Sequence, residues 1–516
     1  MKRFSGLRIN RDQNDSLPCS RWRTAAYPAA ALLAGLFAAQ IIATIQVYLS
    51  NKALYRTLVV IHDAGYLTVP NQQIMNRLHE LGPAFYGGIF FTLSVGAGLS
   101  VLSLTAAWVW DRLFSRSTGF LIFLLLLWVG SLVAVNWKGI SPLVTAYFCV
   151  LPGVVFYVAL RWMPSQNGRS PCSSALIHLM TIGLLASLWV PQMDGSLFLD
   201  LRDRLLFSNP TGVKIADFYY RYTLYPAEAF KSLDQKLLKT CNLEQIRKTS
   251  FKKLLEGKLL SCDYLNTGTK RDVDLKIREE GRALIFENRG KVILRTTAND
   301  FLSHPAHLLK RFSSKTDRYP LFRQFTFLSL LIGLPVTLYL FLYSILLFLL
   351  SRFFDPRTSS VTASILCFSA GVLLLIPVYL GNEGKIEEKD LTRALSSGRW
   401  QERVAALKMI RQKWIDVSGF GPYKCMLTSP DIPERYWLTK ALIVSRSHET
   451  YKDLSGLLDD PSPCVVSMAF MALGQRGDRK AVPEILKRIK TSDHWYPQWY
   501  GYKALKALGW KQTRLK

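Results

Sequence analysis

Seven long stretches of apolar residues constrain this chain more than any other feature of its sequence. A helix needs about 20 mostly apolar residues to cross the hydrocarbon core of a bilayer. The stretch 175–193 is the weakest, because it contains His178 and has Pro191 near its end. We therefore expect a polytopic α-helical membrane protein with about seven spans. The seven stretches are 25–49, 85–110, 118–135, 142–162, 175–193, 325–350 and 361–380.

The composition agrees with this expectation. The chain has 516 residues, of which 49% are hydrophobic, and its formal net charge is +28. These two properties conflict in a single soluble globule, but they fit apolar spans that alternate with basic, water-exposed segments. Binding of nucleic acid is the other common explanation for so basic a chain. It is disfavoured here, because the basic residues are spread over the segments around the apolar stretches and form no recognition motif.

Lysine and arginine in short loops predict the orientation, because cytoplasmic loops of membrane proteins are enriched in both. The N-terminal segment 1–24 carries Lys2, Arg3, Arg8, Arg11, Arg21 and Arg23, so we expect it in the cytoplasm. Seven spans then place three further basic loops on the same side, with Arg112 and Arg116, Arg161 and Arg169, and Arg352 and Arg357. One group opposes this orientation, because Lys310, Arg311, Lys315, Arg318 and Arg323 precede the sixth span on the other side.

The spans divide the chain into five parts. They are a basic cytoplasmic N-terminus (1–24), a five-span membrane region (25–193), an extramembrane insert (194–322), a two-span membrane region (323–381) and a C-terminal domain (382–516). We expect the insert and the C-terminal domain on the periplasmic side of a bacterial inner membrane. In that oxidising compartment, Cys241 with Cys262 and Cys425 with Cys464 could form disulfides. Four unpaired buried thiols are an equally good interpretation.

The insert shows an α+β pattern. Apolar residues recur at helical spacing in two segments, which predicts helices at 227–239 and 242–257. The second helix would begin with Asn242 as its N-cap and end at Gly257. Three shorter segments separated by turn signals predict strands, and the helices before them would cover one face of the resulting sheet. The predicted strands are 272–279, 282–288 and 291–297.

The stretch FYYRYTLYPAEAFK (218–231) contains six aromatic side chains, far more than average composition predicts. Interpreted as a strand, it would place Tyr219, Arg221 and Tyr225 on one face and Phe218 among the residues of the other. Three roles are open for it: packing in the core of the insert, contact with a membrane surface or partner, or a ligand site. Core packing is the simplest interpretation. For a partner contact we assign Tyr219, Arg221 and Tyr225.

The C-terminal domain contains amphipathic helices that repeat along the chain. The segment 457–490 predicts a helix, a short turn and a second helix, and the next segment repeats an acidic turn and a helix. When the two segments are aligned, Asp460 lies opposite Asp493 and Gly474 lies opposite Gly509. Two earlier segments are weaker copies, namely 396–414 and 429–447.

These repeats resemble the HEAT-like helical repeats of the bacterial type related to phycobilisome lyases. The matching motifs are Asp460-Pro461, Ala472-Leu473-Gly474, Gly477-Asp478 and the run Ala481–Leu486, and the resemblance covers about a quarter of the chain. It implies an all-α solenoid whose faces bind segments of other proteins. We assign Trp495, Trp499 and Tyr502 to partner binding on this basis. Lyase activity is not implied, because the repeat alone carries no chromophore chemistry.

No sequence motif predicts catalysis. The apolar stretches contain no Asp or Glu in their interiors, so we do not expect an intramembrane proton relay. His304 and His307 have the spacing of metal ligands, but no third ligand accompanies them, and we expect neither a metal nor a cofactor. Asp63, Asp200 and Asp203 lie close to predicted spans and could serve an enzyme with a lipid-linked substrate. Surface charge is the simpler interpretation of these carboxylates.

The sequence therefore favours a membrane scaffold or accessory subunit of an envelope assembly or export complex. Its partners would be membrane lipids and a protein that binds the HEAT-like repeats and the insert, and not nucleic acid. The insert carries 24 Lys and Arg against 16 Asp and Glu between residues 194 and 322, which suits anionic headgroups or an acidic protein. The alternative is a membrane enzyme or translocation subunit that acts on a lipid-linked or amphiphilic substrate.

Overall fold

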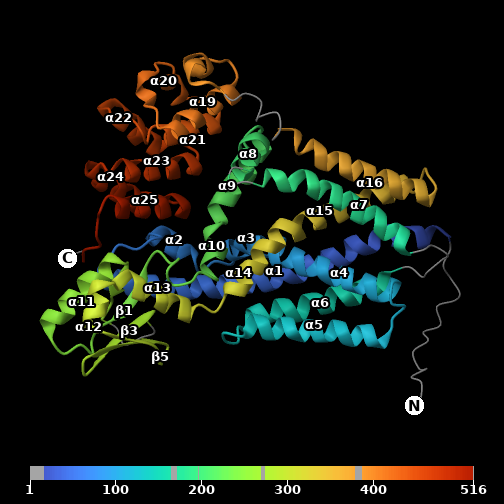
Figure 1. Cartoon of the computed structure of the whole chain (residues 1–516), viewed down its shortest axis with the longest axis horizontal. Coiled ribbons are helices and arrows are strands. Elements are labelled where there is room, and N and C mark those ends of the chain that lie inside the picture. The colour runs from blue at the N-terminus through green and yellow to red at the C-terminus, as the bar shows by residue number, and fades with distance from the viewer. Residues whose placement is uncertain are drawn as a thin grey trace. The chain divides into compact units, whose positions relative to one another are not determined.

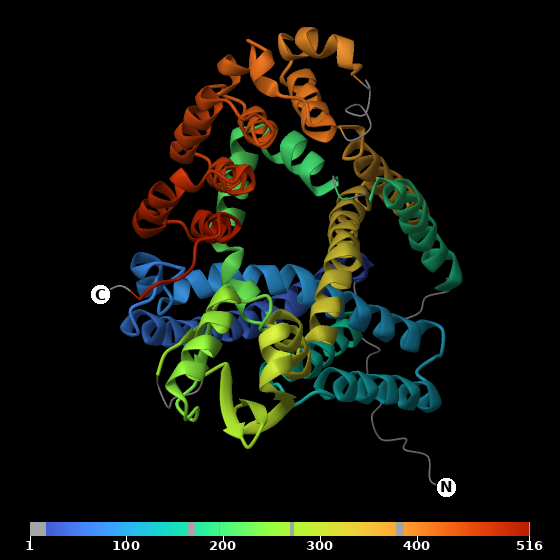
Figure 2. The same cartoon turned by 60° about the vertical axis from the view of Figure 1, so that its left-hand side comes forward.

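The computed structural model describes residues 17–163, 171–193, 195, 197–268, 273–377 and 386–514. Figures 1 and 2 show the course of the chain. Its contacts divide the chain into two compact units. The first unit comprises the residues up to Ile42, Phe91–Gln192 and Leu321–Leu375, and the second comprises Ala43–Phe90, Met193–Pro320 and the chain from Ile376 onward. The second unit thus unites the insert, the C-terminal domain and the segment after the first apolar stretch.

Six helices among the described residues are long and apolar enough to cross a membrane, as a helical membrane protein requires. They confirm six of the seven predicted stretches, and the first runs to Asp63, well beyond its predicted end at residue 49. These helices are Ala26–Asp63, Leu81–Arg112, Thr118–Asn136, Pro142–Trp162, Ala175–Gln192 and Pro320–Leu350. Their parts are α1 (Leu17–Asp63), α3 (Leu81–Phe91), η1 (Thr92–Gly96), α4 (Ala97–Arg112), α5 (Thr118–Asn136), α6 (Pro142–Trp162), α7 (Pro171–Trp189), η2 (Val190–Gln192), α14 (Pro320–Leu328), η4 (Ser329–Gly333) and α15 (Leu334–Leu350).

The seventh predicted stretch, 361–380, coincides with α16 (Pro356–Leu373), which is not among these six helices. Six of the 18 residues of α16 are serine or threonine, so the helix is less apolar than the others. The predicted end of the stretch, at 378–380, lies outside the described residues.

Small residues in the first unit let helices approach closely. A Cβ atom added at Gly98 of α4 would lie 2.2 Å from the Oγ of Ser329, and one added at Gly333 would lie 2.6 Å from the Cα of Gly98. Ser329 and Gly333 are the ends of η4, a π-helical turn within the apolar helix Pro320–Leu350. Gly98 therefore lies at a close helix–helix packing site, as small residues commonly do in membranes.

The insert contains a five-stranded sheet in the order β2-β1-β3-β4-β5. The strands are β1 (Lys239–Asn242), β2 (Tyr264–Asn266), β3 (Leu275–Glu280), β4 (Ala283–Asn288) and β5 (Lys291–Thr297). β1 pairs in parallel with β2 and β3, whereas β3, β4 and β5 form an antiparallel meander. The meander confirms the three predicted strands. The sequence did not predict β1 and β2, because each spans four residues or fewer and shows no alternation.

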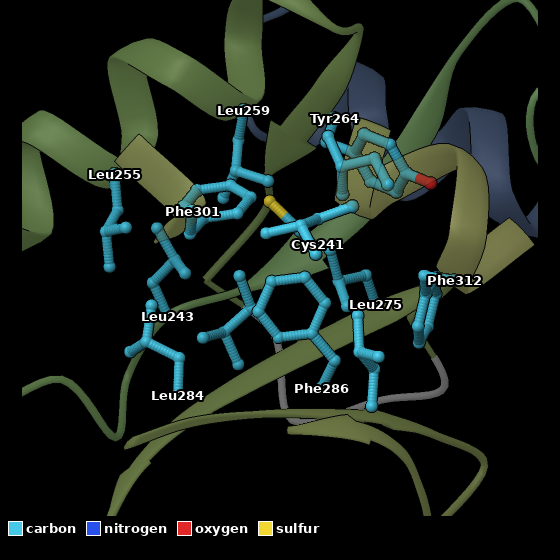
Figure 3. Close-up of a cluster of buried hydrophobic side chains, with 14 of the residues drawn as sticks. Cys241, Leu243, Leu255, Leu259, Tyr264, Leu275, Leu284, Phe286, Phe301 and Phe312 are labelled. Carbon is cyan, nitrogen blue, oxygen red and sulfur yellow. The ribbon is translucent and has the colours of Figure 1, made fainter. Parts of the chain in front are cut away.

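Side chains from β1 to β5 and the neighbouring helices form one apolar core (Figure 3). Cys241 lies near its centre and is fully buried, with Phe286 and Phe301 in the same cluster. Three helices contribute to this core: α11 (Thr249–Ser261), α12 (Ala298–Ser303) and α13 (Pro305–Thr316). The core confirms the expectation of a sheet covered on one face by helices, although two of those helices follow the meander and do not precede it.

The structure contains neither of the two disulfides that the sequence allowed. Cys241, Cys262, Cys425 and Cys464 are all free. Cys241 is buried among apolar side chains, and this burial raises the pKa of its thiol. Cys464 is also buried, with its Sγ 3.3 Å from the Oγ of Ser462, whereas Cys425 is exposed. The interpretation as unpaired thiols therefore holds for all four, and burial holds for two of them.

Three local predictions in the insert were wrong. The predicted helix 227–239 ends early, because α10 (Leu224–Glu228) is followed by turns and then by β1. The predicted helix 242–257 begins only at Thr249 and continues past Gly257. Asn242 does not cap it, since its side chain accepts a hydrogen bond from the Glu244 backbone N–H (2.9 Å). The aromatic stretch is helical and not a strand.

The aromatic stretch belongs to α9 (Pro210–Tyr222) and α10. Asn209 caps α9 by accepting a hydrogen bond from the Gly212 N–H (2.8 Å), and Pro210 fills its first position. Both features favour a helix start. Both features lie before the aromatic residues. The assignment of a strand, which considered only the stretch itself, therefore missed them. Before α9 lie α8 (Leu197–Leu201) and the π-helical turn η3 (Arg202–Leu206), and α2 (Gln72–Arg77) belongs to the same unit.

The C-terminal part of the second unit consists of short helices. Four of them, α19, α21, α23 and α25, pack against one another in sequence order (Figure 1). They begin at Trp400, Ile432, Pro463 and Trp495, so their starts are 32, 31 and 32 residues apart. The elements are η5 (Glu388–Asp390), α18 (Leu391–Leu395), α19 (Trp400–Lys413), η6 (Val417–Gly419), α20 (Tyr423–Met426), α21 (Ile432–Ala441), α22 (His448–Gly456), η7 (Leu457–Asp459), α23 (Pro463–Arg476), η8 (Arg479–Ala481), α24 (Val482–Thr491) and α25 (Trp495–Ala507).

A polar contact recurs at the same place in three of these four helices. The fourth residues of α19, α21 and α25 are Arg403, Arg435 and Gln498, and each donates a hydrogen bond to the carbonyl six residues before it. In α23 this position is Val466. The contact thus recurs at the same position in three of the four helices, and the spacing of the four helix starts gives a common register.

This register corrects the alignment of the last two copies. Gly477 and Gly509 are 32 residues apart, and both have a left-handed φ, of 78° and 77°. Gly509 therefore corresponds to Gly477 and not to Gly474. Gly474 lies inside α23 and does not end it; a Cβ atom there would come within 2.9 Å of the Ala504 Cα on α25. Its role is close packing of the two helices.

We predict that Gly474→Ala destabilises the second unit by about 1–3 kcal/mol, because α23 and α25 would have to move apart. Gly456→Ala is the matched control, since a Cβ atom there meets nothing within 4 Å. The control should be neutral, or stabilising by less than about 1 kcal/mol. Thermal unfolding of the detergent-solubilised full chain measures both, and equal melting temperatures for the two variants would contradict the packing argument.

Candidate functional site

Asn71 joins the segment after the first apolar helix to the C-terminal helices. Its backbone N–H donates to the Oε1 of Gln498 (2.8 Å). Its side-chain amide donates to the carbonyls of Ile489, Lys490 and Ser492 (3.1, 3.0 and 2.8 Å) at the end of α24. The same side chain caps α2 by accepting from the Ile74 N–H. One buried asparagine thus uses its donors and its acceptor to hold two distant parts of the chain together.

The last described residues add further contacts of this kind. The side-chain amide of Gln512 accepts from the Leu67 N–H (3.1 Å) and donates to the Leu67 carbonyl (2.9 Å), as a neighbouring strand would. The Tyr502 hydroxyl donates to Asp263 (2.7 Å), and Arg514 contacts the Tyr66 hydroxyl (3.1 Å). The C-terminal helices therefore contact both the segment 64–71 and the insert.

A buried ion pair makes the third connection. Arg202 donates to the Oδ1 of Asp203 from Nε (2.9 Å) and from Nη2 (2.6 Å), and the two residues are only 9% and 2% exposed. The Oδ2 of Asp203 accepts from the Nε1 of Trp437 on α21 (2.8 Å). The Arg202 guanidinium also donates to the Tyr220 hydroxyl (3.1 Å) and lies 4.0 Å from the Tyr436 ring centroid. Every charge in this cluster has a partner.

The aromatic helix α9 packs against the C-terminal helices through its buried face. The Tyr220 and Tyr496 ring centroids are 4.9 Å apart, and Tyr225, in α10, meets Trp495 edge-on at 5.1 Å. Aromatic pairs at these separations are favourable beyond the area they bury. The aromatic residues thus form an internal joint between the insert and the C-terminal helices. Core packing is confirmed for this face, although the core is shared between two regions.

A cleft lies beside this joint. It has a volume of about 430 Å³, and it is bounded by α9 on one side and by α23, α24 and α25 on the other. Its apolar lining consists of Leu458, Pro461, Pro463, Val466, Phe470 and Pro497. Its polar lining consists of Asp217, Arg221, Asp460, Arg488, Thr491, Ser492, Asp493 and His494.

The charged groups of the cleft differ in how they are used. Asp460 is paired with Arg435 (2.6 Å), and Arg488 contacts Asp459 and Glu484. No ion pair is recorded between any described residue and Asp217, Arg221 or Asp493. One cation and two carboxylates therefore line the cleft beside the apolar side chains and are not held in ion pairs among the described residues.

The two titratable groups nearest Arg221 respond differently to the cleft. Burial raises the pKa of Asp217, and the neighbouring Arg221 partly offsets this. Burial lowers the pKa of His494 to about 4, and Arg221 adds to the effect. The Nδ1 of His494 accepts a hydrogen bond from the Tyr496 N–H (3.3 Å), which keeps the proton on Nε2. His494 is therefore a neutral helix cap at physiological pH.

A second cavity of about 540 Å³ lies on the other side of the Asp459–Pro461 turn. Arg435, Lys452 and Asp453 are among its lining residues, and Asp453 accepts a hydrogen bond from the Tyr423 hydroxyl (2.9 Å). Both cavities thus open beside one turn between successive copies of the repeated unit. The first differs in that α9 of the insert forms one wall.

The structure separates the six residues that the sequence assigned to partner binding. Arg221 lines the cleft, and Tyr219 is 56% exposed on the same helix. Tyr225, Trp495 and Tyr502 are buried in the contacts described above, so assigning them to a partner was wrong. Trp499 is half-buried, with the Lys503 ammonium 3.5 Å from its ring centroid.

Sequence reasoning missed most of the cleft, including Asp217, Phe470, Asp493 and His494. A signal existed for two of them, because Asp493 and His494 stand directly before the first turn of α25 in the repeat register. No local signal existed for Asp217, because its place in the cleft depends on how α9 packs against helices more than 240 residues later.

Comparisons with protein-family models, with curated proteins and with solved structures found no match.

Of the three carboxylates considered for catalysis, two are held in ion pairs and the third is exposed. Asp203 is buried in its ion pair, and Asp200 is paired with Lys408 (2.6 Å), so interpreting these two as plain surface charge was wrong. Asp63 is exposed beside His62 (3.6 Å). Within the described residues, no group of three or more His, Cys, Asp or Glu side chains could hold a metal ion.

We predict that Asp203→Ala destabilises the second unit by about 3–5 kcal/mol, because it leaves the buried Arg202 guanidinium without its partner. Asp63→Ala is the control, since the Asp63 side chain is 70% exposed, and it should change stability by less than about 0.5 kcal/mol. Thermal unfolding of the solubilised full chain, followed by tryptophan fluorescence, measures both. A wild-type melting temperature for Asp203→Ala would overturn the assignment of this ion pair as a structural connection.

Proposed function

We propose that the chain is an integral membrane scaffold or accessory subunit that binds a segment of a partner protein in the cleft beside Arg221. The observation that carries the proposal is the cleft itself, which is lined by apolar side chains and by three charged groups without an ion pair among the described residues. Such a surface suits a peptide that inserts an apolar side chain and pairs with charges at the rim. An envelope assembly or export complex is the kind of machine such a subunit would serve.

The C-terminal helices form a HEAT-like array in this proposal. The spacing of 31 or 32 residues and the recurring contact made by Arg403, Arg435 and Gln498 support it. Arrays of this kind offer extended surfaces to protein segments. The insert adds α9 to one end of the array, which gives the last two copies a cleft wall that a repeat array alone would lack.

Both water-exposed regions and the segment 64–71 lie on one side of the membrane in this proposal. Direct hydrogen bonds support it, because Asn71 and Asp263 each contact the C-terminal helices. The segment 64–71 follows one candidate span and the insert follows five. The C-terminal part can share their side only if the number of crossings before it is odd. This requirement makes α16 the seventh span despite its serine and threonine content.

We expect thiols in both regions to respond identically to a membrane-impermeant maleimide. Single-cysteine variants that retain only Cys425, which is exposed, or only Cys262, which is half-buried, provide the reporters. Because the basic N-terminus predicts a cytoplasmic start, both should be labelled in intact spheroplasts. Labelling of one but not the other would refute the seven-span topology. Labelling of both only after permeabilisation would reverse the orientation.

Photo-crosslinking in cells tests the cleft. With p-benzoylphenylalanine at Thr491, an exposed residue that lines the cleft, we expect one adduct of defined size. Arg221→Glu should weaken that adduct at least about fivefold, because it reverses the only cleft cation that lacks a recorded ion pair among the described residues. Lys253→Glu on α11 is the control with the same charge change.

The probe at Leu254, exposed on α11, should give no adduct of that size. Equal adducts at both positions, or an adduct insensitive to Arg221→Glu, would contradict binding in the cleft. The alternative of a membrane enzyme with a lipid-linked or amphiphilic substrate is not developed further, because Asp200 and Asp203 are both held in ion pairs.

A further inference from the structure

Helix α13 (Pro305–Thr316) divides sharply into two faces. Its buried face consists of Leu308, Leu309, Phe312 and Ser313, and the three apolar side chains belong to the core of the insert. Its other face is mostly polar and strongly basic. That face comprises Ala306, His307, Lys310, Arg311, Ser314 and Lys315, which are all exposed. Arg318, also exposed, lies two residues after the helix end, behind the half-buried Asp317.

The positive charge of this face is not neutralised within the described chain. No ion pair is recorded for Lys310, Arg311, Lys315 or Arg318 with any described residue. Two acidic groups lie near the helix: Asp317 directly follows its last residue, and Asp234 accepts a hydrogen bond from the Ser313 hydroxyl (2.6 Å) on the buried side. The three cations on the exposed face of α13, and Arg318 two residues after the helix, therefore remain solvated or need an external counter-charge.

The chain itself limits how far this face can lie from a bilayer. Only residues 317–319 separate α13 from Pro320, where a 31-residue apolar helix begins. Four steps along the chain span at most about 14 Å. The end of α13 is therefore tethered close to the entry point of that helix into the membrane. Tyr319 stands in this linker, where tyrosine commonly marks the level of the headgroups.

We propose that this face of α13 binds the phosphate groups of anionic phospholipids at the membrane surface. Lysine and arginine side chains beside a span are attracted to anionic headgroups over about one Debye length. A helix with an exposed apolar face could penetrate between acyl chains. The apolar face of α13, however, is buried in the core of residues 194–322. The contact is therefore electrostatic, and it is independent of the cleft and of any partner protein.

This proposal also accounts for a conflict in the sequence. The orientation rule does not favour a cluster of basic residues before the sixth span on the non-cytoplasmic side. Binding of lipid phosphates would explain why these basic residues lie before the sixth span on that side.

The test is native mass spectrometry of the full chain in neutral detergent, titrated with phosphatidylglycerol or with zwitterionic phosphatidylcholine. We expect several bound phosphatidylglycerol molecules and few bound phosphatidylcholine molecules. The variant Lys310→Glu/Arg311→Glu/Lys315→Glu should bind phosphatidylglycerol at least about tenfold more weakly. The control Lys252→Glu/Lys253→Glu/Lys258→Glu on α11 changes the charge equally and should retain binding.

A glutamine version of the α13 variant keeps the test valid if charge reversal perturbs folding, because these side chains are exposed. Equal losses in the α11 and α13 variants would overturn the proposal in favour of non-specific attraction. Full competition by millimolar inorganic phosphate would overturn it in favour of a free-anion site. Unchanged lipid binding together with loss of a co-purified acidic protein would overturn it in favour of a protein contact.

Discussion

The ion pair between Arg202 and Asp203 is the interaction on which the rest of the second unit depends. It lies at the start of the insert and reaches Tyr220 in α9 and Trp437 in α21 through direct hydrogen bonds. Two charges removed from water are stable only when every polar atom is satisfied. Satisfying them here fixes α9 against the C-terminal helices, and that placement creates the cleft.

The elements that sequence reasoning predicted correctly are those governed by local patterns. Six apolar stretches and the strands β3 to β5 follow directly from hydropathy and alternation. The predicted helix 227–239 failed because long-range pairing outweighs local periodicity: β1 lies between β2 and β3, and the Thr240 N–H donates to Asp274 (3.0 Å). Such a contact spans 34 residues and leaves no trace in helical spacing.

The candidate site shows the same division between local and distant information. Arg221 could be found because it stands in a conspicuous aromatic stretch, and Asp493 could be found from the repeat. Core packing was the simplest interpretation of the aromatic stretch, but Tyr225 and Trp495 were assigned to partner binding, whereas they bury each other. The relation between α9 and α25 depends on residues about 270 positions apart, which no periodicity within either segment encodes.

The contact between Leu67 and Gln512 has a consequence for biogenesis. The two residues are 445 positions apart, yet the backbone of one is satisfied by the side chain of the other. At synthesis rates of 5–20 residues per second, Gln512 is synthesised roughly 20 to 90 seconds after the segment 64–71 that it contacts. During that interval Asn71 and its neighbours have no native acceptors, so the second unit is completed only after residue 512 has been synthesised.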